Sequence, residues 1–201
     1  MEIKTSEIIA ASKLRQTALI IHKYATVHAA TAGLLAQTIV GDTLALSFLT
    51  VAMESTIVAL NGGRWTKKLG AAVLSIMTGT YVGVYGGAFL LKWMPGIGNA
   101  ANAAASFVTT ELVGWTTYVL LSSGLSIDVL TDTQKKAIFE EAKRMAKNEK
   151  GNGKQMYKRM SREDKNRIDT YVKQIVRASE DKDESVLNDL AQKFAEIAAK
   201  Y

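Results

Sequence analysis

The distribution of charge constrains this chain more than any other feature of its sequence. Residues 25–130 contain only eight Asp, Glu, Lys or Arg residues, and their charges sum to zero. Residues 131–201, by contrast, contain 17 basic and 13 acidic residues. A soluble bundle needs polar outer faces on most of its helices, so the central segment must be buried against something. We therefore divide the chain into an N-terminal amphipathic helix (1–24), a hydrophobic helical domain (25–130) and charged C-terminal helices (131–201).

Helices are expected throughout, because no run alternates strictly between apolar and polar residues as a strand would. A polar helix is predicted to open at Thr131 or Asp132, and two amphipathic helices follow it. The fold class is therefore all-α, a helical bundle with a central Gly/Ala-rich hydrophobic hairpin and charged amphipathic helices at its ends. The earlier helical segments are predicted over residues 6–24, 43–60, 65–93 and 98–123, with a second apolar stretch over 25–40 and breaks at 41–43, 61–63 and 151–153.

Residues 69–91 form a run of 23 residues without a formal charge. As a helix this run would be about 34 Å long, which is enough to cross the hydrocarbon core of a bilayer. Tryptophan and lysine on both sides are typical of interfacial anchors of a membrane span. The run therefore predicts membrane association, and the alternative is a buried helix of a soluble bundle. The predicted anchors are Trp65, Lys67, Lys68, Lys92 and Trp93.

Small residues recur every fourth position in the same run, at Ala71, Ser75, Gly79, Gly83 and Gly87. Such a stripe lets a second helix backbone approach closely, and close packing would offset the low helix propensity of glycine. The segment after the run has a similar stripe that starts at Gly98 and ends at Gly114. We therefore predict a tight antiparallel hairpin over residues 66–123. Its corner is formed by Pro95, Gly96 and Gly98, and its packing residues are Gly79, Gly83, Gly87 and Gly98.

A resemblance to a known family rests on several segments in succession. These are "VHAATAGLLAQ" at 27–37, a break at Asp42, the basic "GGRWTKKLG" at 62–70, and the "LLKWMPGIGNAANAA" corner at 90–104. Over about residues 25–124 the chain resembles the YcjF-like domain of unknown function, although "QTIVGD" departs from the proline-containing break of that family. The resemblance implies a hydrophobic helical domain, location at the inner membrane in some members, and an Era-like small GTPase as a separate partner.

Two acidic residues lie in the middle of apolar helical segments, Glu54 in "TVAMESTIV" and Glu111 in "VTTELVGW". A carboxylate in such surroundings must be paired, hydrated, or protonated with a raised pKa. Both are candidates for buried or intramembrane acids, in an ion path or a carboxylate metal site, and the alternative is an ordinary surface position. His22 and His28 are not spaced as two ligands on one helix face, and the chain has no cysteine.

Catalytic patterns are not indicated by the sequence, which contains no phosphate-binding G-x-x-x-x-G-K-[ST] motif and no defensible nucleophile constellation. We predict a non-enzymatic protein without cofactor or metal. Its net charge of +6 favours anionic partners. Residues 143–167 contain ten basic and three acidic residues, a composition suited to anionic lipid. Tyr157 is the single aromatic residue there, so nucleic acid is not expected. The lipid-binding candidates are Lys143, Arg144, Lys147, Lys158 and Arg159.

Three functions are compatible with these features. The first is a membrane-associated, self-associating helical protein, located at the inner membrane with its C-terminal part in the cytoplasm and acting alone or with a small GTPase. The second is a pore-forming or channel-like protein, because the arrangement of helices is similar in outline to the pore-forming domains of colicins. The third is a cytoplasmic helical adaptor whose apolar region is buried by partners or by further copies of the chain.

Overall fold

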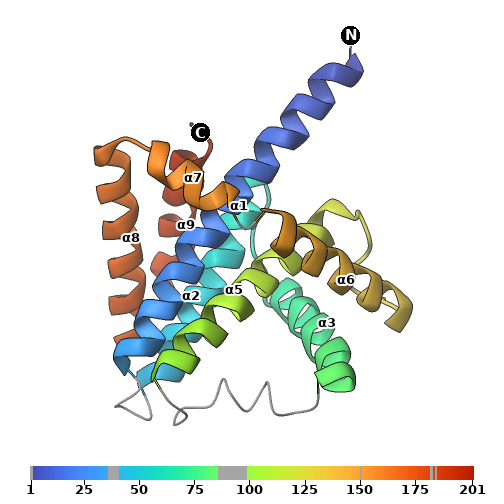
Figure 1. Cartoon of the computed structure of the whole chain (residues 1–201), viewed down its shortest axis with the longest axis horizontal. Coiled ribbons are helices and arrows are strands. Elements are labelled where there is room, and N and C mark those ends of the chain that lie inside the picture. Colours follow the sequence, from blue (N-terminus) through green and yellow to red (C-terminus); the bar gives the residue numbers. More distant parts are fainter. Residues whose placement is uncertain (1, 36–40, 86–98, 150, 182, 184) are drawn as a thin grey trace.

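The computed structural model of this protein describes residues 2–35, 41–85, 99–149, 151–181, 183 and 185–201, with only the backbone described in some helical turns (Figure 1). All regular elements of these residues are α-helices, which confirms the predicted fold class. In chain order they are α1 (Glu2–Leu35), α2 (Gly41–Leu60), α3 (Lys67–Tyr85), α5 (Asn99–Ser122), α6 (Asp132–Glu149), α7 (Asn152–Arg159), α8 (Arg162–Glu180) and α9 (Ser185–Ala198).

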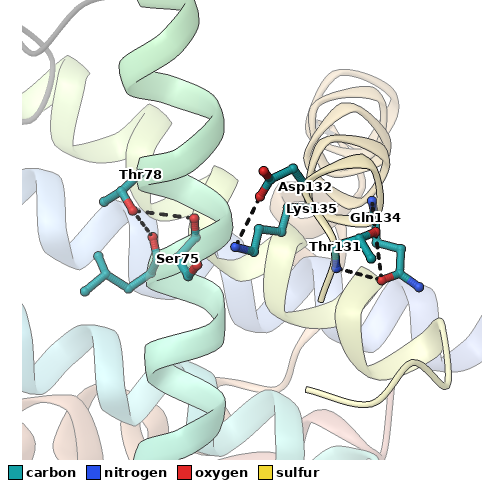
Figure 2. A network of polar contacts seen from close by, with 7 residues as sticks. Ser75, Thr78, Thr131, Asp132, Gln134 and Lys135 are labelled. Atoms are coloured by element: carbon teal, nitrogen blue, oxygen red, sulfur yellow. Dashed lines mark hydrogen bonds and ion pairs between the residues drawn. The ribbon is translucent and has the colours of Figure 1, made fainter. Parts of the chain in front are cut away.

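Local sequence signals place several helix ends as expected. Gly62 and Gly124 have positive φ angles of 79° and 64°, a conformation that glycine adopts readily, and they follow the ends of α2 and α5. At the start of α6 the backbone N–H of Gln134 donates to Thr131 Oγ1 (3.3 Å). The backbone N–H of Thr131 donates in return to the side-chain oxygen Oε1 of Gln134 (2.9 Å). Figure 2 shows this reciprocal capping box at the start of α6, and Thr78 on the opposite side of α3.

One hydrophobic core extends through the N-terminal, central and C-terminal parts of the chain. Tyr24 of α1 is fully buried in this core. The Tyr24 ring stacks on Phe194 of α9 with ring centroids 5.4 Å apart, and its hydroxyl lies 3.1 Å from Thr56 Oγ1 of α2. Tyr24 therefore joins three helices at the position where the sequence suggested a boundary between two units.

Charged helices cover the central apolar helices. Helix α2 lies against α1, α5, α8 and α9. The amphipathic α9 directs Leu190, Phe194 and Ile197 into the core, and α8 contributes Ile168 and Ile175. Much of the uncharged segment is therefore buried by the charged C-terminal helices, which turn their apolar faces inward.

Helix α1 differs from the expectation of separate segments over 6–24 and 25–40, because it is continuous from Glu2 to Leu35. The predicted break at 151–153 is also different: α7 begins at Asn152, and Gly153 is buried against α1. A Cβ atom at Gly153 would lie 2.2 Å from the Ala18 carbonyl oxygen, so this glycine permits close contact between two helices and does not form a loose loop.

The predicted hairpin over 66–123 is described only in part. Helix α3 lies against both α5 and α6. Gly79 is exposed, and a Cβ there would meet no atom within 4 Å of the described structure. Gly114 of α5 lies close to α1, where a Cβ would be 2.6 Å from Ile21 Cγ1. The small residues thus give close approach between α1 and α5. Only the backbone of Gly83 is described, and Gly87, Pro95, Gly96 and Gly98 lie outside the described residues.

Candidate functional site

Glu54 of α2 has a side chain that is only 4% exposed. Its Oε2 atom accepts a 2.7 Å hydrogen bond from the indole Nε1 of Trp65, which lies just before α3. Gly70, in the second turn of α3, leaves room for this pair, because a Cβ there would be 2.8 Å from the Trp65 ring and 3.4 Å from Glu54 Oε2. The acid therefore anchors the segment between α2 and α3.

Burial raises the pKa of Glu54 from its ordinary value of 4.5 to about 7, and the Trp65 hydrogen bond opposes this shift in part. Glu54 therefore holds its proton to a higher pH than a carboxyl group in water does. Chemically, a carboxyl group in this setting can act as a hydrogen-bond donor or lose its proton as the pH rises. The Glu54–Trp65 bond also gives Trp65, predicted as an interfacial anchor, a structural contact inside the fold.

Glu111 of α5 and His28 of α1 are likewise buried. The Nδ1 atom of His28 lies 2.5 Å from the hydroxyl oxygen of Thr110, which joins α1 to α5. His22 is half-buried and contacts the edge of Phe107, and its pKa is lowered by burial and then by the nearby charges of Lys154 and Lys23. Both histidines therefore belong to α1 and contact residues of α5.

A metal centre does not emerge from the part of the chain that the structure describes. Its His, Asp and Glu side chains form no group of three that could hold a metal ion. The Glu54 carboxyl group accepts its hydrogen bond from Trp65 and lies beside Gly70, where a Cβ would be 3.4 Å from its Oε2. These surroundings suit a buried hydrogen-bonded acid.

The predicted anchors fall into two groups. Lys67 and Lys68 are exposed in the first turn of α3, and Lys68 forms an ion pair with Asp128 in the segment before α6. Lys92 and Trp93 lie outside the described residues. Within the described ranges, none of the helices combines the length and the apolar character needed to cross a bilayer. The last six residues of the uncharged run, 86–91, also lie outside the described ranges.

The predicted lipid-binding residues differ in how strongly they are engaged. Lys143 pairs with Glu140 (3.0 Å), and Arg144 pairs with Glu141 (2.5 Å), both within α6. Lys158 and Arg159 of α7 are exposed and have no carboxylate partner among the described residues. Lys147 is also exposed. Three exposed basic residues of the 143–167 stretch, Lys154, Lys158 and Arg159, therefore lie on α7, which contains no acidic residue.

Tyr157 shows how the basic stretch is attached to the bundle. Its ring has Lys23 Nζ 5.0 Å and Lys165 Nζ 5.6 Å from the ring centroid, which are cation–π distances. Lys165 also donates to the Lys158 carbonyl oxygen at 2.9 Å. The aromatic ring of this stretch is thus occupied by neighbouring lysines inside the protein.

Sequence patterns did not indicate a second group of residues near α7. Arg15 of α1 and Arg159 of α7 line one crevice of about 240 Å³ together with Met156 and Tyr201. Their positions are 144 residues apart in the chain, so spacing gave no signal of their proximity. One weak indication of this proximity does exist in the sequence. Gly153 lies near the start of a short basic helix, and a glycine there permits that helix to cross α1 closely.

Comparisons of the chain with protein-family models, curated protein sequences and solved structures give no match. The resemblance of residues 25–124 to the YcjF-like domain therefore stays a prediction. The class of protein that the described structure defines is an all-α helical bundle whose core includes both apolar and charged segments of the chain.

Proposed function

We propose that this chain is a non-enzymatic helical protein that attaches to anionic membrane surfaces through α7 and the adjoining end of α6. The observation that carries this proposal is that the basic side chains of α7 are exposed and are not offset by acidic residues of the same helix. Lys154, Lys158 and Arg159 are exposed, and α7 contains no acidic residue to offset them. Basic side chains near an anionic bilayer contribute about 1 kcal/mol each.

The position of α7 favours attachment at one end of the bundle. Gly153 contacts α1 at Ala18, whereas α1 ends at Leu35, 17 residues further on. At a rise of 1.5 Å per residue, Ala18 and Leu35 are about 26 Å apart along the axis of α1. Figure 1 likewise places α7 near the projecting N-terminal turns of α1, away from the end where α2 and α5 begin. The basic side chains of α7 therefore lie toward the opposite end of the bundle from Leu35 and from the starts of α2 and α5.

Vesicle flotation across a salt series tests this function with the full chain. Triple replacement of Lys154, Lys158 and Arg159 by Gln should weaken binding to vesicles with anionic lipid by about 3 kcal/mol, or roughly a hundredfold. Binding of the unchanged protein should also fall as salt rises. The matched control replaces three exposed basic residues elsewhere, Lys67, Lys173 and Arg177, by Gln. Equal losses in both triple variants, or no flotation of the unchanged protein, would reject the proposal.

A second candidate function, a helical adaptor, is favoured by the outer face of α3. Leu74 is 61% exposed, and Ala71 and Gly79 are exposed on the same side of the helix. This α3 outer face (Ala71, Leu74, Ser75, Thr78 and Gly79) carries no charge. It would suit a helix of a second copy or of a separate partner such as the small GTPase that the family resemblance implies.

Light scattering on purified protein, with no vesicles present, tests the adaptor function. If α3 mediates self-association, Leu74→Glu should convert an oligomer to a monomer, because a charge would be buried in the contact. The control Lys136→Glu places the same charge on the exposed surface of α6. A monomer before any substitution would exclude self-association through α3.

A further inference from the structure

The crevice formed by Arg15, Met156, Arg159 and Tyr201 brings two arginines together from different helices. Both arginines are exposed, and neither forms an ion pair with a described residue. None of the four side chains that line the crevice is a carboxylate. Two guanidinium groups that line the same crevice favour an anion between them.

The three parts of the crevice are held in place by separate contacts. Gly153 allows the start of α7 to pack on Ala18 of α1. Gln16 Nε2, next to Arg15, donates to the Ala199 carbonyl oxygen at 3.1 Å and so fixes the C-terminal segment on α1. The Tyr201 hydroxyl accepts from the Ser161 amide at 3.0 Å. The crevice is thus built before any ligand arrives, which lowers the entropic cost of binding.

The acidic side chain that contacts Tyr201, Asp164, is already engaged by other groups. Asp164 accepts from Lys200 Nζ at 3.1 Å and from the Tyr201 hydroxyl at 3.0 Å. These contacts keep the pKa of Asp164 below its ordinary value, Lys200 contributing most. Its negative charge is therefore offset by Lys200 and does not neutralise the two arginines.

We propose that Arg15 and Arg159 bind a phosphomonoester group in this crevice. A terminal phosphate offers three oxygens, so each planar guanidinium can donate two parallel hydrogen bonds to it. The volume of about 240 Å³ is below the roughly 300–1,000 Å³ of sites that enclose whole drug-sized ligands. It therefore suits one charged group with its attached carbon atoms. Met156 supplies an apolar wall for those carbons.

This inference rests on the proposed function, because a lipid headgroup with a terminal phosphate would place the phosphate at the membrane surface that α7 contacts. Free phosphate or a soluble phosphomonoester is the other source of the same chemistry. The two sources are separated by comparing vesicles with inorganic phosphate in solution.

The test measures binding of the full chain to vesicles that contain phosphatidic acid or phosphatidylserine, prepared with equal surface potential. Phosphatidic acid has a terminal phosphomonoester, whereas phosphatidylserine has a phosphodiester. We expect a preference of at least tenfold for phosphatidic acid. Arg15→Gln and Arg159→Gln should each abolish the preference, because each leaves a single guanidinium at the phosphate. Lys158→Gln, on the same helix as Arg159, should weaken binding to both vesicles equally and keep the preference.

A second measurement titrates inorganic phosphate while NMR follows the side-chain Nε–H signals of arginine. Saturable shifts of two arginine signals that both vanish in Arg15→Gln, without a lipid preference, would assign the crevice to free phosphate. Equal binding to both vesicles together with no saturable arginine shift would overturn the phosphate site while leaving membrane attachment intact. Failure of every vesicle to bind, with the arginine shifts preserved, would instead reject the membrane function alone.

Discussion

At the scale of single residues, the glycines show how surroundings decide what a residue does. A Cβ at Gly153 would lie 2.2 Å from the Ala18 carbonyl oxygen, and one at Gly114 would lie 2.6 Å from Ile21 Cγ1. A Cβ at Gly79 would meet no described atom within 4 Å. All three lie in helices, where glycine is unfavourable by about 1 kcal/mol relative to alanine. Only the first two are compensated by close helix contact within the described structure.

Substitution of these glycines by alanine should therefore give opposite signs. Gly153→Ala should lower the free energy of unfolding by about 1–3 kcal/mol, because the clash is with backbone and α7 must move. Gly114→Ala should also destabilise, because the Ile21 side chain must shift. Gly79→Ala, the control, should raise the stability by up to about 1 kcal/mol. Urea unfolding measures all three, and a destabilising Gly79→Ala would show that this glycine is needed for close packing after all.

These glycines also show the limit of reasoning from spacing. The every-fourth-residue stripe predicted that small residues bring the two helices of the 66–123 hairpin together, but Gly114 of α5 instead lies against Ile21 of α1. The spacing does not specify which helix lies opposite, and for Gly114 the partner is α1. Gly153 belongs to no stripe, so its packing role depends on a tertiary contact that sequence alone does not reveal.

Glu54 gives a prediction about pH. Its pKa is about 7 in the folded protein, above its ordinary value of 4.5, so the folded state holds this proton more tightly than the unfolded chain. The stabilisation from the protonated form is complete below pH 4.5 and is lost as the pH rises to about 7. The loss amounts to about 3 kcal/mol by linkage. Glu54→Gln keeps an acceptor for the Trp65 indole but cannot ionise.

Urea unfolding of the unchanged protein and of Glu54→Gln from pH 4 to pH 8.5 measures this effect. The free energy of unfolding of Glu54→Gln minus that of the unchanged protein should increase by about 3 kcal/mol between pH 4.5 and 8. Taking this difference removes the contributions of the other titrating groups, which both proteins share. A pH-independent difference for Glu54→Gln would mean that Glu54 titrates at its ordinary pKa.

At the scale of elements, local signals in the sequence were sufficient to locate most helix ends. The Thr131–Gln134 capping box and the glycines after α2 and α5 act within a few residues, so they can be recognised without knowledge of the fold. The continuity of α1 could not be recognised in this way. The change from a charged to an uncharged composition near residue 24 reflects a change of neighbours along a single helix.

A proline at an exposed position near that change tests the continuity of α1. Thr26 is exposed, and its hydroxyl donates to the His22 carbonyl oxygen at 2.8 Å within the helix. Thr26→Pro should cost about 3 kcal/mol or more, because the ring clashes with the carbonyl four residues earlier and removes an amide donor. Thr26→Ala should have little effect on stability. Toleration of proline, measured by thermal unfolding, would indicate that a helix break near residue 25 is present in solution.

At the scale of the whole molecule, charge composition and packing divide the chain differently. The sequence divides by charge into residues 1–24, 25–130 and 131–201. The core nevertheless includes a residue of each segment, namely Tyr24, Trp115 and Phe194. Amphipathic helices explain the difference, because the charges of α8 and α9 face outward while their apolar residues cover α2. Average composition records both faces together and therefore hides the inward one.

Truncation after residue 130 tests whether the charged helices belong to the same cooperative unit. The shortened chain loses α6–α9, and with them the helices that cover α2 and the α7 contact on α1. We expect the full chain to unfold in one transition and residues 1–130 to show none, with the exposed α2 face binding a hydrophobic dye such as ANS. Adding residues 131–201 as a separate chain should restore part of the transition. If 1–130 unfolds cooperatively by itself and binds no dye, the division by charge is also a division into domains.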